Sequence, residues 1–276
     1  MFIQPIECDR CHRKGDSGGI QISSQLGVDR AHCQCGSTFE VSSDQLMLSA
    51  NEFSRLRILS NHTEYGTVAA TPGISTKVTF KRPFEFACRA HVTPVVPDGF
   101  LVLFREHFLQ KDSMLVLNSV LREEHLKPVN PISFNWHVFG LVEINMLPAW
   151  YLQYYSALTH LINGLFKPAL LDYGTAFELF LETFLRKRLT ASVGQRMTDY
   201  LLEKAWRIDE RIKDLLEQVC GQRLTARLDV YQPWDEYVRK PRNELSHGKK
   251  LGGDEPAAER AHQATWQAIK WIESLP

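Results

Sequence analysis

The sequence predicts an α+β multidomain protein made of three parts. These are a small N-terminal module over residues 1–47, a central small antiparallel β-rich domain over residues 48–147 and an α-helical bundle over residues 148–276. Three observations predict this organisation. Four of the six cysteines fall within the first 35 residues, apolar and polar residues alternate through the centre, and apolar residues recur at helical spacing after Pro148. A length of 276 residues suits two or three domains.

The composition excludes several classes of protein. Lys and Arg number 32 and Asp and Glu number 32, so the formal net charge is zero and a strongly basic nucleic-acid coat is excluded at the level of the whole chain. A hydrophobic share of 44% and a charged share of 23% are typical of a folded chain. There is no apolar run of about 18 residues, and residues 1–15 do not follow the pattern of a signal peptide. We therefore expect a cytoplasmic protein with no membrane partner.

The N-terminal module is defined by two close cysteine pairs separated by 21 residues. In a reducing compartment such pairs are more typical of metal binding than of disulfides, and four thiolates suit one tetrahedral Zn²⁺. The arrangement resembles a zinc ribbon, with a structural rather than a catalytic zinc because four thiolates fill the coordination shell. His12 and His32 are competing ligands, and reduced thiols in a small domain are the alternative. The predicted ligands are Cys8, Cys11, Cys33 and Cys35.

The central region reads mostly as strands. A short helix is predicted over residues 43–59 and a loop over residues 61–74. From residue 75 the apolar side chains recur with a period of two, which is typical of half-buried strands. These positions are Val78, Phe80, Phe84, Phe86, Cys88, Ala90 and Val92. We therefore expect a small, mainly antiparallel sheet over residues 75–145, with no recognisable catalytic set.

The C-terminal region reads as helices. Segment 149–165 is rich in aromatic and aliphatic residues, and apolar residues fall on one face of segments 168–189, 197–219 and 257–275. Short connections between four or five such helices are typical of an up-and-down bundle.

The segment from Val238 to Lys250 holds the candidate chemistry. It contains five basic residues, one acid and one histidine. Pro241 favours a first helical turn or a kink in a continuing helix, and Gly248 favours a helix end. His247 then lies near the negative end of a helix dipole, within reach of the Arg242 guanidinium. A histidine that moves protons beside an arginine that binds anions suits phosphate chemistry, although a solvated helix end with a structural histidine is the alternative.

The run Arg242-Asn243-Glu244-Leu245-Ser246-His247 resembles the Arg-x4-6-His motif of the HEPN superfamily, in its Arg-Asn-x3-His form. The segment from Ala176 to Glu182 resembles the acidic, apolar helix that faces this motif in the family. The resemblance covers residues 148–276, under half of the chain. This sequence departs from the pattern at Pro241, directly before Arg242.

The resemblance implies a metal-independent endoribonuclease. The 2′-hydroxyl of the RNA substrate would attack the adjacent phosphate and leave a 2′,3′-cyclic phosphate end. His247 would be the general acid and base, and Arg242 would bind the scissile phosphate. Asn243 would orient His247 or the phosphate, and Glu178 or Glu182 would hold Arg242 or His247 in place. Family members act as homodimers whose two motifs face one cleft.

The resemblance also implies regulation. A role in antiviral defence or toxin-like growth arrest, controlled by a regulatory protein or a phage component, follows from the family analogy alone. Two other functions remain open. One is a non-catalytic interaction module that recruits a partner. The other is a nucleotide-binding regulator in which Arg242 and Lys249 or Lys250 hold a phosphate that is never cleaved.

Overall fold

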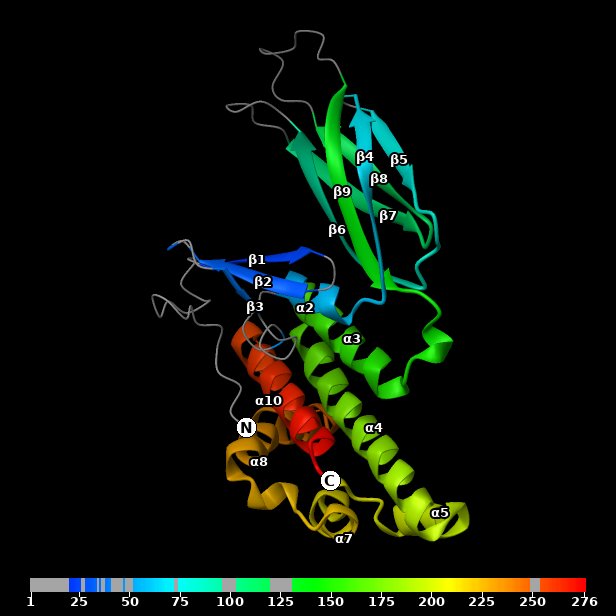
Figure 1. Ribbon diagram of the computed structural model, residues 1–276, viewed down its shortest axis with the longest axis vertical. Coiled ribbons are helices and arrows are strands. Elements are labelled where there is room, and N and C mark those ends of the chain that lie inside the picture. The colour runs from blue at the N-terminus through cyan, green and yellow to red at the C-terminus, as the bar shows by residue number, and fades with distance from the viewer. Residues whose placement is uncertain are drawn as a thin grey trace. The chain divides into compact units, whose positions relative to one another are not determined.

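A computed structural model describes residues 20–25, 28–33, 35, 38–40, 47, 52–71, 74–95, 103–119, 131–248 and 254–276 (Figure 1). The chain divides into two compact units. The sheet unit is residues 56–146, and the helical unit combines residues 1–55 with residues 147–276. None of the helices in the described ranges has both the length and the apolar character needed to cross a membrane.

The predicted fold class is wrong in its N-terminal part. The structure is a mixed α/β protein with small antiparallel sheets and a C-terminal helical region. Within the described ranges, no group of three or more His, Cys, Asp or Glu side chains is placed to hold a metal ion, so the zinc ribbon of the predicted class is not found there. Backbone pairing instead orders the described part of this segment. Strands β1 (Ile20–Gln25), β2 (Val28–Cys33) and β3 (Thr38–Glu40) form one antiparallel sheet.

The sheet unit contains two three-stranded antiparallel sheets (Figure 1). The first has the order β4-β9-β6, in which β9 pairs with both neighbours. The second has the order β5-β8-β7. The strands are β4 (His62–Ala70), β5 (Ser75–Thr79), β6 (Phe86–Val95), β7 (Leu103–Gln110), β8 (Ser113–Ser119) and β9 (Ile132–Leu141).

The two sheets share one apolar core, toward which alternate residues of β4 and β5 point. Phe134 and Val138 of β9 pack with Val78 of β5 and with Met114 and Val116 of β8. The predicted period-two pattern is confirmed in part. Phe86 is 40% exposed, the side chain of Cys88 is not described, and the buried positions are Val78, Phe80, Phe84, Ala90 and Val92.

The predicted loop over residues 61–74 is wrong for most of its length. Strand β4 occupies His62–Ala70, and Ala70 at its end is fully buried. Its small residues and threonines carry little apolar signal of their own. Nine register pairs with β9 define this strand, from His62 opposite Gly140 to Ala70 opposite Ile132.

The predicted helix over residues 43–59 is confirmed over its second half, where helix α2 runs over Glu52–Leu59. Met47 is also helical, and the other residues from 43 to 51 lie outside the described ranges. After the 3-10 turn η3 (Ile144–Met146) the chain becomes helical. Helix α3 (Ala149–Ile162) confirms the first predicted helix of the C-terminal region, and α4 (Phe166–Val193) extends the second one to 28 residues.

The predicted helix over residues 197–219 is interrupted. Helix α5 (Gln195–Lys204) ends before Ala205, and a new helical stretch begins at Ile208. This stretch consists of α6 (Ile208–Glu210), the π-helical turn η4 (Arg211–Leu215) and α7 (Leu216–Cys220). The guanidinium of Arg211 donates hydrogen bonds to the carbonyl oxygens of Ala205, at 2.8 Å, and Leu202, at 3.5 Å. Side-chain contacts across the break therefore stabilise an interruption that apolar periodicity does not indicate.

The last helices pack on α4. After the short η5 (Leu224–Ala226), helical turns follow without interruption through α8 (Leu228–Trp234), η6 (Asp235–Arg239) and α9 (Lys240–Ser246). Helix α10 (Glu255–Glu273) confirms the last predicted helix. Helix α4 contacts α3, α5, α9 and α10, so it is the central element of the helical unit (Figure 1).

A buried histidine joins three of these helices to an earlier segment. His262 of α10 is fully buried, and its Nδ1 lies 2.9 Å from the hydroxyl of Tyr154 on α3 and 3.4 Å from that of Tyr173 on α4. Its Nε2 lies 2.7 Å from the carbonyl oxygen of Met47. Burial lowers the pKa of His262 to about 3, helped by the nearby Arg55 guanidinium and opposed by Glu259. The imidazole is therefore neutral in the folded protein at pH 7.

We predict that acid destabilises the protein through this residue. In the unfolded chain His262 titrates near pH 6.5, so between pH 6.5 and about 3 the unfolded state binds one more proton than the folded state. The contribution of His262 to the free energy of unfolding is complete above pH 6.5 and decreases as the pH falls. At pH 5 the protein has lost about 2 kcal/mol of this contribution. Thermal unfolding at pH 7 and pH 5 measures it.

The variant His262→Gln should show a smaller loss between the two pH values, because its side chain does not titrate. His160→Gln is the matched control, since His160 is only partly buried and pairs with Asp172 at 3.0 Å. An equal pH dependence in the wild type and in His262→Gln would contradict this account.

Candidate functional site

The Arg-x4-His motif lies at the end of the continuous helix formed by α8, η6 and α9. Pro233 and Pro241 both lie within this helix, and the π-helical turn Asp235–Arg239 lies between them. A proline inside a helix removes one backbone donor, and a widened turn is a common way to accommodate the disturbance. Of the two sequence alternatives for Pro241, the structure thus has the continuing helix. Arg242 follows directly on this helix.

Gly174 brings Arg242 close to the central helix. A methyl group added at Gly174 would lie 2.7 Å from Cγ and 3.2 Å from Cβ of Arg242, distances too short for a side chain. Glycine within a helix costs about 1 kcal/mol relative to alanine. Gly174 nevertheless leaves room for the aliphatic part of the Arg242 side chain to cross the α4 backbone.

The guanidinium of Arg242 reaches Glu178, one turn further along α4. Nη2 of Arg242 donates to Oε2 of Glu178 at 2.8 Å, and the two side chains are 30% and 32% exposed. Burial raises the pKa of Glu178, and the charges of Arg242 and Arg211 lower it only in part, so the pKa stays above its usual value. A perturbed carboxyl beside a half-exposed guanidinium is a pattern found at functional sites.

Glu182 has different partners. Its Oε2 accepts from Nη1 of Arg211 at 3.0 Å and its Oε1 accepts from Nη2 of Arg186 at 3.2 Å. Burial raises the pKa of Glu182, but the hydrogen bonds from Arg186 and Arg211 more than offset this, so the pKa is lowered. Of the two predicted acidic residues, Glu178 pairs with the motif and Glu182 pairs with the turn that follows α5.

His247 and Asn243 lie at the C-terminal end of α9. The backbone N–H of His247 donates to the carbonyl oxygen of Asn243 at 3.1 Å, which closes the last helical turn. The His247 side chain is exposed and makes no hydrogen bond to another described residue. Gly248 follows with a φ of 70°, a left-handed conformation that suits glycine and ends the helix.

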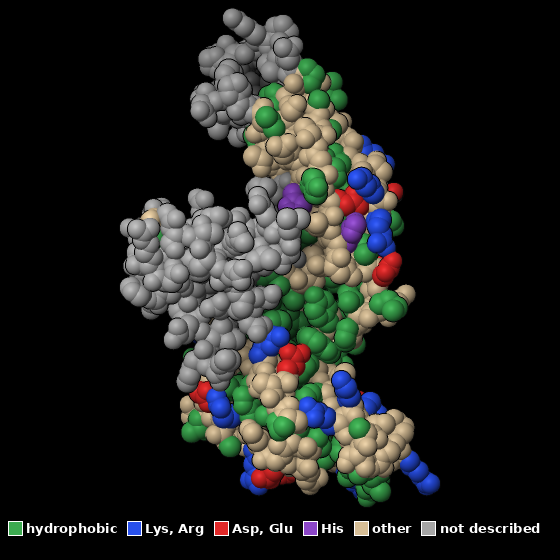
Figure 2. Space-filling view, viewed as in Figure 1, with side chains coloured by type: hydrophobic (Ala, Val, Ile, Leu, Met, Phe, Trp, Pro, Cys, Tyr) green, Lys and Arg blue, Asp and Glu red, His purple; other side chains and the backbone are tan. Residues whose placement is uncertain are grey.

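The two neighbouring basic residues that the structure describes, Arg239 and Lys240, are both paired with carboxylates. Asp235 binds both Arg239, at 2.5 Å, and Lys240, at 2.8 Å, and Arg239 also pairs with Asp209 at 3.3 Å. Lys249 and Lys250 lie outside the described residues. Figure 2 shows basic and acidic side chains interspersed over the visible face of the helical unit, so no continuous basic patch covers that face.

The predicted zinc ligands lie largely outside the described part of the chain. Cys8 and Cys11 are not described, and Cys33 is described only as the last residue of β2. Cys35 is partly buried. The structural zinc stays a prediction.

Two residues that shape this site, Gly174 and Arg211, could not be predicted from the sequence. Neither carries a periodic signal, and their roles come from contacts with distant segments. Comparisons with protein-family models, curated proteins and solved structures found no match for this chain. The resemblance to the HEPN superfamily therefore rests on the motif and its surrounding helices.

We predict that Gly174→Ala acts oppositely in two backgrounds. In the wild type the new methyl group collides with the Arg242 stem, so the protein should unfold at a lower temperature. In Arg242→Gly the whole side chain is absent, including the Cβ at 3.2 Å, so the better helix propensity of alanine at position 174 should stabilise the protein by up to about 1 kcal/mol. Thermal or urea unfolding of the four proteins measures this. Equal effects in both backgrounds would contradict the close approach.

Proposed function

We propose that this protein is a metal-independent endoribonuclease of the HEPN type, which cleaves RNA by attack of a 2′-hydroxyl to give 2′,3′-cyclic phosphate ends. The observation that supports this proposal best is that the Arg242 and His247 side chains of the motif lie in different environments. Arg242 is half-buried against α4 and held by Glu178, whereas His247 is exposed at the end of the same helix. An anchored cation and an accessible imidazole are the two groups that this reaction needs.

His247 is the proton-transfer group of the proposal. An exposed imidazole can take the proton of the attacking 2′-hydroxyl and return a proton to the leaving 5′-oxygen. The hydrogen bond from its backbone N–H to Asn243 sets the position of the residue at the helix end. Asn243, four positions earlier on the helix, would orient the imidazole or the phosphate.

Arg242 is the phosphate-binding group. Its guanidinium offers five N–H donors, and the contact with Glu178 is made through Nη2 alone. The remaining donors can bind the non-bridging oxygens of the scissile phosphate and stabilise the added charge of the transition state. Because the carboxylate form of Glu178 is disfavoured by burial, an arriving phosphate competes with it for the guanidinium.

A homodimer would complete the site. Arg242 and His247 are five positions apart, about 140° around a helix, so they project toward different sides of the helix. Two copies related by a twofold axis can place Arg242 of one beside His247 of the other. A dimer of this kind, regulated by a protein or phage component in antiviral defence or growth arrest, is the proposed context.

We predict that the purified protein cleaves single-stranded RNA in the presence of EDTA, spares DNA and leaves cyclic phosphate ends. His247→Ala should reduce the cleavage rate by a factor of about 10² to 10⁴, the usual contribution of general acid–base catalysis. Arg242→Ala should reduce it at least as much. End-group analysis of a defined RNA by mass spectrometry measures both the rate and the product.

The control is His160→Ala, because His160 lies on α3 of the same unit and pairs with Asp172 rather than with the motif. It should cleave like the wild type. Cleavage that survives in His247→Ala, or RNA that stays intact under every condition, would contradict the proposal. The second result would leave a non-catalytic binding module or a nucleotide-binding regulator.

The shared site makes a further prediction. Arg242→Ala and His247→Ala are each inactive, but a mixture of the two should regain activity, since mixed dimers contain one complete pair of Arg242 and His247. Free exchange of subunits should restore up to about a quarter of the wild-type rate, because half of the dimers are mixed and each holds one of two pairs. A mixture as inactive as either parent would contradict a site built from two copies.

A further inference from the structure

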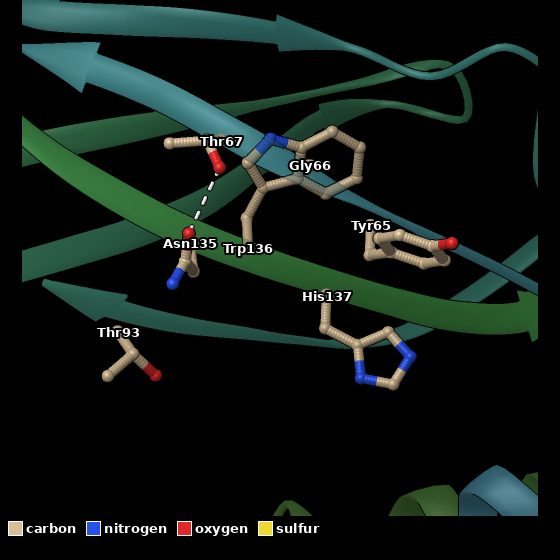
Figure 3. Close-up of a pocket in the computed structure, with 7 residues that line it drawn as sticks. All are labelled: Tyr65, Gly66, Thr67, Thr93, Asn135, Trp136 and His137. Atoms are coloured by element: carbon tan, nitrogen blue, oxygen red, sulfur yellow. Dashed lines mark hydrogen bonds between the residues drawn. The ribbon is translucent and has the colours of Figure 1, made fainter. Parts of the chain in front are cut away.

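The outer face of the β4-β9-β6 sheet carries a second candidate site, in the sheet unit. The pleat turns alternate residues of β4 outward, and Tyr65 and Thr67 of this set lie opposite His137 and Asn135 of β9. Thr93 of β6 lies opposite Asn135 on the other side. These five side chains line a shallow pocket of about 480 Å³ (Figure 3).

Tyr65 offers the pocket an open aromatic surface. Its side chain is 78% exposed, although an aromatic residue of a small sheet usually gains by packing. Next to it, Gly66 lies against the indole of Trp136, and a methyl group there would be 2.8 Å from the ring. Trp136 also packs against the core from the inner side, so the sheet beneath the pocket is held rigidly.

The polar side chains are arranged in a fixed way. Thr67 Oγ1 donates to Oδ1 of Asn135 at 3.0 Å, which orients the amide (Figure 3). The amide nitrogen of Asn135 has no hydrogen-bond partner among the described residues. The imidazole of His137 is positioned by Thr63 Oγ1, at 2.8 Å from its Nε2, and by the ring of Phe139. An aromatic surface and an oriented donor therefore line the same pocket, at diagonal positions of neighbouring strands.

The uncharged lining of the pocket limits the classes of ligand that it can bind. None of the residues that line it is Asp, Glu, Lys or Arg. The absence of Lys and Arg there argues against a site that grips phosphate groups. The absence of carboxylates leaves few acceptors for the many hydroxyl groups of a sugar, which argues against a carbohydrate ligand. It also means that no negative side chain in the pocket repels a polyanion such as a nucleic acid. An unpaired nucleobase fits what is present, because its face stacks on an aromatic ring and its edge accepts from an amide.

We propose that this pocket binds an unpaired nucleobase, stacked on Tyr65 and hydrogen-bonded by Asn135. The site belongs to the sheet unit and uses none of the residues of the motif, so it goes beyond the proposed ribonuclease activity and does not depend on it. Because recognition is through the base, the affinity should change little with salt concentration, unlike binding through phosphates.

The experiment measures binding of a fluorescein-labelled ten-nucleotide single-stranded RNA by anisotropy, with the full chain carrying His247→Ala so that no cleavage interferes. Tyr65→Ala should weaken binding by about tenfold or more, Tyr65→Phe should retain it, and Asn135→Ala should weaken it. Phe86→Ala is the matched control, because Phe86 is another exposed aromatic residue of the sheet unit, at 40%. It should bind like the parent.

Two competition experiments identify the source of the base. If uridine or adenosine monophosphate competes at the same concentration as unlabelled RNA, the ligand is a free nucleotide, whereas a higher affinity for the ten-nucleotide RNA indicates an RNA strand. Either result supports the site if Tyr65→Ala abolishes it. No binding, binding of glucose in preference to RNA, or binding that falls steeply with salt and ignores Tyr65 would overturn the proposal. Loss of cleavage in the motif variants would leave this result unchanged, so the two proposals fail separately.

Discussion

The close approach of α9 to α4 is the contact on which the candidate site depends. It requires the absence of a side chain at Gly174, because the stem of Arg242 occupies the space that a methyl group would fill. Once the stem lies there, Glu178 on the next turn is the carboxylate within reach, and the ion pair at 2.8 Å follows. The same packing leaves the C-terminal end of α9 at the surface, where His247 is exposed. One contact therefore sets the environments of both motif residues.

Two glycines play the same physical part in the two units. Gly174 admits the stem of Arg242, and Gly66 admits the indole of Trp136. In each case the missing side chain allows a bulky neighbour to cross the backbone, and in each case the neighbour belongs to a candidate site. In a packed interior, the room for a large side chain comes from a small one opposite.

Much of the secondary structure could be predicted from the sequence, and the exceptions have physical causes. Helices α3, α4 and α10 have long apolar faces, and apolar residues alternate in and around β5 and β6, so periodicity identifies these elements. Strand β4 has the sequence pattern of a loop, because its ladder with β9 comes from residues about 70 positions away. The break after α5 has no periodic signal, because it depends on contacts of Arg211 with carbonyl groups.

The sequence by itself determined the residues of the motif, their spacing and the helix that carries them, since these are local properties. Only the tertiary structure decided that Glu178 and not Glu182 pairs with Arg242, because both acids lie on the same face of α4 and only the crossing point of α9 distinguishes them. It likewise decided that Tyr65, Asn135 and His137 share one surface, because their strands are adjacent through pairing and not through the chain. Local patterns set which groups are available, and long-range packing sets which of them meet.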